Sequence, residues 1–320
     1  MAKITHIETY FPSWKMSNAD LEAVVEGINL EKIASKIGIQ SRFVVAEDET
    51  VLTMAIGACE KLFTTTEKSD IDYLLLCTQS PDYFLPTTAC ILQHATGLPT
   101  TCAALDFNLG CSGYVYGLSL AKGLIASGQA KKVLLVTSEA YSKHIKHEDI
   151  ANRSIFGDAA TASLIEESDN DGIGNLSLGT DGSGAENLIV KNGGMCQPSK
   201  DGSDDDYLYM NGPEIFNFTI KAVPLLVDAV LEKNGETLST IDYAVFHQAN
   251  EYMLKHLRKK CKIEAEKFHL DMTSVGNTVS STIPIGLRQA LDEKRIKAGS
   301  KVLIVGFGVG YSYGGTILTL

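Results

Sequence analysis

The sequence predicts an α/β protein built from two duplicated halves, residues 1–170 and 171–320. Two apolar segments repeat in the same order at an offset of about 170 residues: residues 71–76 (IDYLLL) recur as 241–246 (IDYAVF), and 132–136 (KVLLV) recur as 301–305 (KVLIV). Runs of this kind are typical of strands buried on both faces. Helical patterns lie between them, and strands that alternate with helices indicate βαβ units with parallel or mixed sheets.

The helical patterns occupy matching places in the two halves. Residues 114–127 have helical spacing and stop before Gly128, and residues 283–293 hold the equivalent position. Residues 192–206, rich in Gly, Ser and Asp, are expected to form an exposed loop inside the second half. The alternative to duplication is chance similarity between generic buried strands, which the matching order and offset disfavour.

Composition and charge exclude several classes of protein. Of the 320 residues, 44% are apolar and 21% charged, as in ordinary globular proteins. The net charge of −11 argues against non-specific nucleic-acid binding, which needs a basic surface. No apolar run approaches the roughly 18 to 20 residues that span a bilayer, and the N-terminus has no signal-peptide pattern. We therefore expect a cytoplasmic protein that binds neither membranes nor nucleic acid.

Cys111 is the candidate nucleophile among seven cysteines. The set is odd in number and has no CxxC pair, so we expect reduced thiols rather than disulfides or a zinc site. Cys111 lies in residues 106–114 (DFNLGCSGY), where an apolar stretch stops at small residues and a helix begins. A helix N-terminus favours an anion, which would lower the pKa of the thiol and make it a nucleophile. From this segment alone, a buried structural cysteine is an equal alternative.

Two further segments carry polar groups that could serve the same cleft. His247 follows the repeated strand 241–246 and precedes a helix, a position suited to exchanging protons or donating a hydrogen bond. Asn277 lies in residues 274–284 (SVGNTVSSTIP), whose small polar residues cap the next helix. Taken singly, His247 could be structural and Asn277 a cap or turn residue. Duplicated halves, however, bring equivalent strand ends together, where groups from both halves can converge.

These blocks, in this order, resemble the 3-oxoacyl-[acyl-carrier-protein] synthase III family of the thiolase superfamily. The resemblance rests on GCSG around Cys111, HQAN at 247–250, GNT at 276–278 followed by IP at 283–284, and the glycine-rich loop 306–312 (GFGVGYS). Residues 85–90 (LPTTAC) and 156–160 (FGDAA) match two more family segments. The implied architecture is the thiolase fold, with two βαβαβ halves in α-β-α-β-α layers.

The resemblance implies ping-pong acyl transfer followed by decarboxylative Claisen condensation. Cys111 would hold the acyl group, and the backbone N–H groups of Cys111 and Val309 would form the oxyanion hole. Val309 replaces a glycine that many relatives have, but only its N–H is required. A malonyl thioester would then lose CO2, and His247 and Asn277 would stabilise the enolate that gives the 3-oxoacyl product. Neither a metal nor a redox cofactor is implied.

The resemblance also implies substrate contacts and protein partners. The family's substrate-binding positions correspond to Leu85, Phe156, Ala249, Asn250, Gly308 and Tyr311. The residue at the position of Leu85 reaches across a dimer interface in the family, so a homodimer is implied, with core packing at the interface as the alternative. Lys259 and Lys260 would dock an acidic acyl carrier protein. However, Asn217 and Tyr252 replace other basic docking residues, and a solvated helix face is the alternative.

Three substitutions distinguish this chain from the fatty-acid-initiating members, which hold the coenzyme A adenine between a tryptophan and an arginine. The tryptophan position is Lys32, a nearby arginine position is Lys36, and the arginine position before FGD is Ile150. Loss of both stacking partners would remove about 2 kcal/mol of binding, which disfavours acetyl-CoA as the acyl donor. A carrier-bound, longer or aromatic acyl group fits better, while acyl-CoA held by other contacts stays open.

Related enzyme classes differ from this chain at diagnostic positions. Hydroxymethylglutaryl-CoA synthases have a glutamate general acid where this chain has Gln79, and thiolases have a second cysteine in the glycine-rich C-terminal loop, where this chain has none. Chalcone-synthase-like type III polyketide synthases share the Cys-His-Asn set but are usually longer. They stay an alternative, as do an acyltransferase that passes the acyl group to oxygen or nitrogen without decarboxylation and a catalytically silent scaffold.

Overall fold

Two mixed β-sheets form the centre of the computed structural model, which describes residues 1–24 and 29–320. The first sheet has the strand order β1-β7-β6-β4-β5. Its strands are β1 (Ala2–Tyr10), β4 (Tyr73–Cys77), β5 (Ala103–Phe107), β6 (Lys132–Glu139) and β7 (Ala159–Glu167). Strand β4 runs parallel to β5 and β6, whereas β7 is antiparallel to β6 and β1.

The second sheet repeats this topology with the order β8-β13-β12-β11. Its strands are β8 (Ser177–Thr180), β11 (Tyr243–Phe246), β12 (Lys301–Gly308) and β13 (Ser312–Thr319). Strand β11 pairs in parallel with β12, with Tyr243 opposite Val302, just as β4 pairs with β6, with Tyr73 opposite Val133. A single parallel bridge from Ala244 to Phe268 stands where the first sheet has β5. The repeated sequence segments therefore form equivalent strands, which confirms the predicted duplication.

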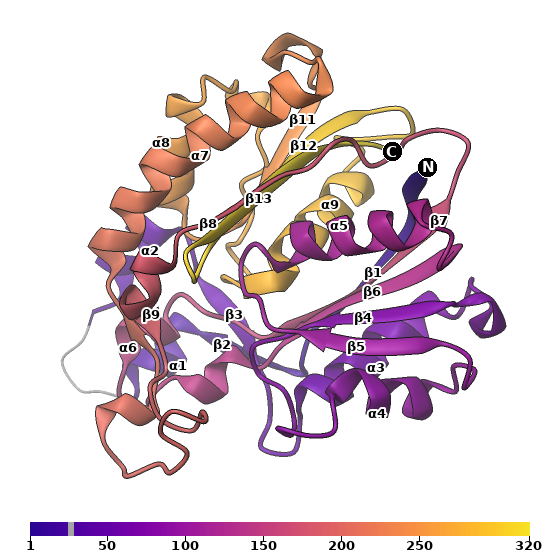
Figure 1. Ribbon diagram of the computed structural model, residues 1–320. Coiled ribbons are helices and arrows are strands. Elements are labelled where there is room, and N and C mark those ends of the chain that lie inside the picture. The colour runs from indigo at the N-terminus through magenta and orange to yellow at the C-terminus, as the bar shows by residue number, and fades with distance from the viewer. Residues whose placement is uncertain (25–28) are drawn as a thin grey trace.

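Helices separate the two sheets and cover their outer faces, as Figure 1 shows. The central layer consists of α5 (Gly113–Ala126) and α9 (Thr282–Asp292), and each contacts strands of both sheets. The outer layers are formed by α3 (Val51–Leu62) and α4 (Thr88–Thr96) on the first sheet and by α7 (Gly212–Asn234) and α8 (Glu251–Lys260) on the second. The predicted α-β-α-β-α layering and both predicted helices are confirmed.

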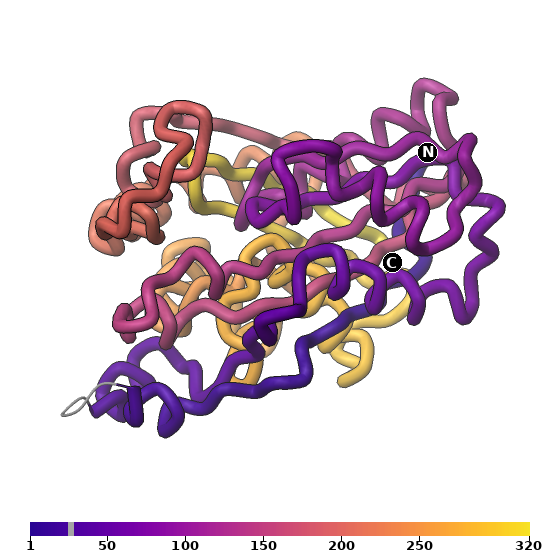
Figure 2. The backbone as a smooth tube through the Cα atoms, turned by 90° about the horizontal axis from the view of Figure 1, so that it is seen from below, coloured from indigo at the N-terminus to yellow at the C-terminus, as the bar shows by residue number. Residues whose placement is uncertain are grey.

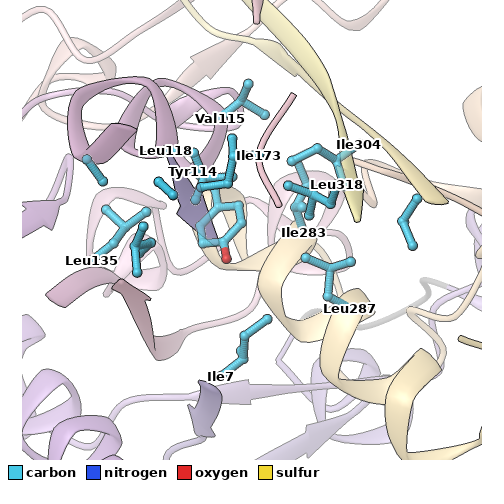
Figure 3. Close-up of a cluster of buried hydrophobic side chains, with 14 of the residues drawn as sticks. Ile7, Tyr114, Val115, Leu118, Leu135, Ile173, Ile283, Leu287, Ile304 and Leu318 are labelled. Carbon is cyan, nitrogen blue, oxygen red and sulfur yellow. The ribbon is translucent and has the colours of Figure 1, made fainter. Parts of the chain in front are cut away.

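The apolar core between the sheets joins the two halves of the chain (Figure 3). Tyr114 and Leu118 of α5 lie one helical turn apart, so they share the face that packs on the strands. Ile283 and Leu287 repeat this spacing on α9, and Ile304 of β12 packs in the same cluster. Each such fully buried apolar side chain stabilises the fold by about 1.5–3 kcal/mol. The positions of the loops that precede α5 and α9 therefore depend on one shared core.

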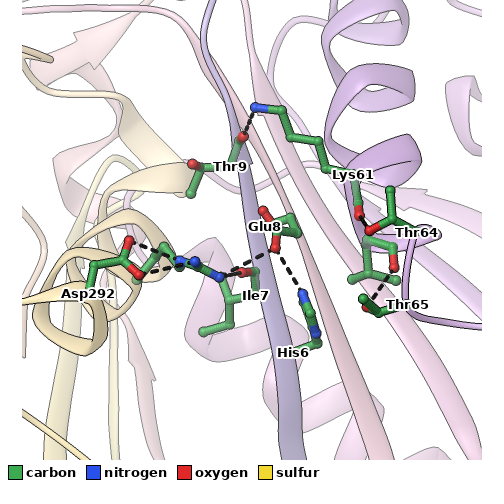
Figure 4. Close-up of polar contacts among 10 residues, drawn as sticks. His6, Ile7, Glu8, Thr9, Lys61, Thr64, Thr65 and Asp292 are labelled. Carbon is green, nitrogen blue, oxygen red and sulfur yellow. Dashed lines mark hydrogen bonds and ion pairs between the residues drawn. The ribbon is translucent and has the colours of Figure 1, made fainter. Parts of the chain in front are cut away.

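Polar contacts attach strand β1 to helices of both halves (Figure 4). Lys61 of α3 donates a hydrogen bond from Nζ to the backbone oxygen of Thr9 at 2.7 Å. From the other side, Arg288 of α9 donates to the backbone oxygen of Ile7 at 3.2 Å and forms an ion pair with Glu8 at 3.3 Å. These contacts add to the apolar core in fixing how the two halves meet.

Shorter elements lie outside the five layers. They are the hairpin of β2 (Trp14–Ser17) and β3 (Ser41–Val44), the pair β9 (Leu188–Ile189) and β10 (Tyr209–Met210), and the helices α1 (Asn18–Glu22), α2 (Glu31–Ile37) and α6 (Ile150–Arg153). Residues 194–205 are exposed, as predicted, while the amide of Asn192 donates to the carboxylate of Asp206 at 2.8 Å and closes this loop at its base.

The view in Figure 2 and that in Figure 1 both place the N- and C-terminal ends on the same side of the molecule. Among the helices of the described residues, none has the length and apolar character needed to cross a membrane.

Candidate active site

The segments that follow β5 and β11, together with the end of β12, meet at a cavity of about 160 Å³. Cys111, His247 and Asn277 all line it, so the three candidate side chains converge in one site. The rest of the lining is mostly apolar: Tyr141, Ile155, Phe156, Leu188, Met210, Gly212, Ile215, Ala249, Asn250, Met253, Phe307 and Gly308. An apolar cavity with a few convergent polar groups is the usual form of a site for a small ligand.

Cys111 lies two residues before α5 and is 6% exposed. Strand β12 passes so close that a Cβ on Gly308 would lie 2.7 Å from the Cβ of Cys111 and 2.9 Å from its sulfur. Glycine is therefore required at residue 308. The close approach brings the backbone N–H of Val309 to the sulfur, where the N–H of Cys111 also points. Two N–H groups at the sulfur of a nucleophile are the donors that an oxyanion hole needs.

The pKa of the Cys111 thiol is raised to about 12. Burial is the largest cause and the nearby carboxylate of Glu139 is the second, whereas the N–H groups of Val309 and Cys111 lower this pKa by less. The prediction that the helix N-terminus lowers the pKa of Cys111 is therefore wrong for the resting protein, because desolvation outweighs the helix end. The thiol is protonated at rest and must lose its proton as it reacts.

His247 directly follows β11 and is 2% exposed. Burial lowers its pKa to about 3, so the imidazole is neutral near pH 7. Its Nδ1 lies 2.7 Å from Oγ1 of Thr282, and its ring packs edge-on against Phe307 with the centroids 5.4 Å apart. A neutral imidazole carries one N–H donor and one acceptor nitrogen. His247 can therefore offer a ligand a hydrogen bond without bringing a charge into the cavity.

Asn277 is fixed by its backbone and by its side-chain oxygen. Its N–H donates to the backbone oxygen of Ile155 at 2.8 Å, and its carbonyl accepts from the N–H of Gly157 at 3.0 Å. Its Oδ1 accepts the N–H of Val279 at 2.9 Å, which makes Asn277 a turn residue, as the structural alternative supposed. Because this bond occupies Oδ1, the NH2 group is the part of the amide that can donate to a ligand.

Glu139 is a buried carboxylate near Cys111 that is not among the predicted site residues. It is fully buried at the end of β6, where its oxygens accept hydrogen bonds from the backbone N–H of Gln79 at 3.0 Å and from the hydroxyls of Ser280 at 2.9 Å and Ser80 at 3.2 Å. Burial raises its pKa to about 8. The signal that could have found it is a carboxylate three residues after the repeated segment 132–136, at a strand end where functional groups gather.

Four of the six predicted substrate contacts line the cavity: Phe156, Ala249, Asn250 and Gly308. Asn250 also caps α8, since its side chain accepts the N–H of Met253 at 2.9 Å. Leu85 lies on the loop before α4 and is 82% exposed in the single chain.

Tyr311 does not line this cavity but a separate one, with Asn187 and Phe218, so its predicted substrate contact stays a prediction. Its ring stacks on Phe218 of α7 with the centroids 4.0 Å apart, and its hydroxyl accepts a hydrogen bond from Asn187 at 2.8 Å. These contacts hold the side chain against α7 and away from the residues that surround Cys111.

The basic residues singled out in the sequence lie on neighbouring helices. Lys259 and Lys260 are exposed at the C-terminal end of α8. Lys32 and Lys36 are exposed on α2, which contacts α8. Ile150, by contrast, is 5% exposed and packs with Met16, Leu21 and Leu30. Its side chain is therefore part of a small core rather than a surface on which an adenine could stack.

Comparison with known proteins identifies the family of the chain. The model of 3-oxoacyl-[acyl-carrier-protein] synthase III matches residues 105–182, and the model of the C-terminal part of that family matches residues 231–320. The chain is 34% identical to a β-ketoacyl-[acyl-carrier-protein] synthase III of Clostridium perfringens, over 100% of this chain and 99% of that protein.

Two solved structures extend the comparison. A 3-oxoacyl-(acyl-carrier-protein) synthase III is 43% identical with a TM-score of 0.96, over 100% of this chain and 99% of the other. The priming β-ketosynthase from the R1128 polyketide biosynthetic pathway is 26% identical with a TM-score of 0.94, over 100% of this chain and 96% of the other. The thiolase fold is therefore confirmed, and the chain belongs to the 3-oxoacyl-[acyl-carrier-protein] synthase III family.

Proposed function

We propose that this protein is a condensing acyltransferase that loads an acyl group on Cys111 and joins it to a malonyl thioester with loss of CO2. The observation that carries the proposal is the meeting of one thiol, two backbone N–H donors, a neutral imidazole and an amide in a single apolar cavity. Each of these groups corresponds to one requirement of the two half-reactions. The synthase III relatives support the same reaction class.

In the loading half-reaction, the sulfur of Cys111 attacks the carbonyl carbon of an acyl thioester. The N–H groups of Cys111 and Val309 stabilise the oxyanion that forms, and one such donor lowers the barrier by about 3 kcal/mol. The bond from the carbonyl carbon to the donor sulfur then breaks, and the departing thiolate takes the proton of the Cys111 thiol. The products are the acylated Cys111 and a free carrier thiol.

In the condensing half-reaction, the carbon–carboxylate bond of a malonyl thioester breaks and releases CO2. Its electron pair moves into an enolate, whose oxygen accepts hydrogen bonds from His247 and Asn277. The enolate carbon attacks the acyl carbonyl, and the oxyanion hole holds the new oxyanion. The bond from the acyl carbon to the sulfur then breaks, and the thiolate of Cys111 leaves and takes up a proton from solvent water. The chemistry uses groups of this chain alone, so a metal or redox cofactor is no part of the proposal.

The donor and the partners are part of the proposal. The apolar cavity suits an acyl chain, and the buried position of Ile150 supports a donor that does not depend on adenine stacking. Lys259 and Lys260, with the lysines of α2 beside them, offer an acidic acyl carrier protein a basic surface. A homodimer and a cytoplasmic location stay predictions.

Intact-mass spectrometry of the protein with a panel of acyl-CoA and acyl-carrier thioesters tests the proposal. We expect a single acyl adduct that Cys111→Ser abolishes, and CO2 with a 3-oxoacyl product after malonyl-carrier protein is added. Asn277→Ala should still load but should release CO2 about 10²-fold more slowly, since it loses a donor to the enolate oxygen. An adduct that is transferred to an alcohol or amine without CO2 release would instead identify the non-decarboxylating acyltransferase.

A further inference from the structure

Thr282 connects His247 to the first turn of α9. It is the first residue of that helix and is 2% exposed. Its Oγ1 lies 2.7 Å from Nδ1 of His247 and 3.0 Å from the backbone oxygen of Val279. The hydroxyl carries a single proton, so it can donate to only one of these two acceptors at a time.

The backbone oxygen of Val279 already has a donor without this hydroxyl. The N–H of Thr282 donates to the same oxygen and closes the turn before α9. Nδ1 of His247 also lies nearer to Oγ1, at 2.7 Å, than this backbone oxygen does, at 3.0 Å. The hydroxyl proton is therefore free to go to Nδ1, and when the hydroxyl donates there, Nδ1 must be unprotonated. In a neutral imidazole this places the ring proton on Nε2, because the partner of one ring nitrogen determines which nitrogen is protonated.

We propose that Thr282 is a positioning residue that holds the neutral imidazole of His247 with its proton on Nε2, so that the ring donates a hydrogen bond into the cavity. Because Nδ1 faces Thr282, the edge of the ring with Nε2 is the edge left for a ligand. The role of this arrangement in catalysis rests on the proposed function. The position of the ring proton does not depend on that function and can be measured without it.

The two neutral tautomers differ in what they offer an enolate. With the proton on Nε2, the imidazole donates to the thioester oxygen that gains negative charge as CO2 leaves. With the proton on Nδ1, a lone pair would face that oxygen and repel it. Loading of Cys111 relies instead on the N–H groups of Cys111 and Val309. Removal of the Thr282 hydroxyl should therefore slow decarboxylation far more than loading.

Three variants separate the role of the hydroxyl from that of the local structure. Thr282→Val keeps the shape of the side chain but removes the hydroxyl, and Thr282→Ser restores a hydroxyl without the methyl group. Thr278→Val is the matched control, because the Thr278 hydroxyl is buried in the same turn and has no hydrogen-bond partner among the described residues. Thermal unfolding of each variant checks that it is folded.

The first measurement is the ¹⁵N spectrum of histidine-labelled protein, with the His247 signals assigned by their loss in His247→Gln. We expect a proton on Nε2 in the wild type, in Thr282→Ser and in Thr278→Val, and mixed tautomers in Thr282→Val. The second measurement compares half-reactions. Thr282→Val should lose about 10- to 100-fold in CO2 release, the range known for residues that orient metal-bound histidines, while its loading rate changes less than about threefold.

A proton on Nδ1 in the wild type would overturn the inference, and so would an unchanged tautomer in Thr282→Val. Equal losses in loading and decarboxylation would show a general structural role and would also overturn it. The spectrum does not depend on turnover. If the wild type released no CO2, the proposed function would be refuted, but the spectrum would still show which ring nitrogen of His247 carries the proton.

Discussion

At the scale of single residues, two opposing influences act on the pKa of Cys111. Burial and the carboxylate of Glu139 raise the pKa of the thiol, while the N–H groups of Val309 and Cys111 lower it. The same N–H groups are the ones that would stabilise a tetrahedral oxyanion. The site is therefore arranged to favour negative charge on the reacting oxygen rather than a thiolate at rest. Glu139 does not line the cavity, so a substitution there can change the pKa of Cys111 without changing the cavity lining.

Glu139→Gln is expected to lower the pKa of Cys111. The pKa of Glu139 is about 8, so its charge is fully present only above that pH, where it disfavours a second negative charge on the sulfur. Glutamine keeps an acceptor for the N–H of Gln79 and supplies a donor to Ser280. The rate of alkylation of Cys111 by iodoacetamide, measured from pH 7 to 11, should rise at a lower pH in the variant than in the wild type.

Glu139→Gln should also change how the stability of the folded protein depends on pH. The pKa of Glu139 is raised in the folded state, to about 8 from an ordinary 4.5, so the folded protein binds more protons between these values. Its contribution to stability is complete below pH 4.5 and is lost as the pH rises through 8. Urea unfolding should show this decline in the wild type and a weaker one in Glu139→Gln. Identical alkylation and unfolding profiles for both proteins would contradict the assignment.

At the scale of elements, helix α8 depends on a residue that also faces the cavity. Asn250 accepts the N–H of Met253 as the N-cap of α8, and its side chain lines the wall near His247. Asn250→Ala should lower the free energy of unfolding by about 1 kcal/mol, because it leaves a first-turn N–H without its partner. Asn250→Asp keeps the cap and should retain that stability. Urea unfolding of the two variants measures the difference.

Measurements of acyl loading and condensation in the same two variants distinguish the role of Asn250 as the cap of α8 from a contact with substrate. If Asn250 acts on substrate through its NH2 group, Asn250→Asp should fold normally and still lose activity, since a carboxylate cannot donate there. Full activity in Asn250→Asp would leave the cap as the only role of this side chain.

The elements were predictable where the sequence pattern is local or repeated. The repeated segments became β4 and β11, and β6 and β12, because apolar runs of this kind can only be buried between helices. Helix α5 ends before Gly128, whose φ of 73° suits a residue without a side chain. The sequence places Glu139 at a strand end, but its burial was not predictable, and neither were the raised pKa of Cys111 and the placement of Tyr311. Burial and ring packing depend on segments that lie far apart in the chain.

At the scale of the whole molecule, the duplicated halves place the chemistry at the start of the two central helices. Cys111 precedes α5, Asn277 precedes α9, and the core shared by these helices and both sheets fixes their separation. His247 reaches the same place from the end of β11, beside the closing residues of β12. Because each half supplies only part of the site, neither half is expected to be active alone.

A second feature of the whole molecule is an apolar loop that the single chain leaves uncovered. Tyr83, Phe84 and Leu85, just before α4, are 61%, 79% and 82% exposed. Burial of a side chain such as leucine or phenylalanine gains about 1.5–3 kcal/mol, so three adjacent ones favour contact with a second copy. This is the loop that the family resemblance places at a dimer interface.

Leu85→Asp is therefore expected to weaken the homodimer, because it would place a charge at an apolar contact. Sedimentation velocity at several protein concentrations should show a wild-type dimer and a variant that dissociates at concentrations at least 10-fold higher, which corresponds to about 1.4 kcal/mol. Leu225→Asp is the matched control: Leu225 is 70% exposed on α7, and the same change there should leave the dimer intact. A monomeric wild type, or equal dissociation of both variants, would refute the assignment of this loop to the interface.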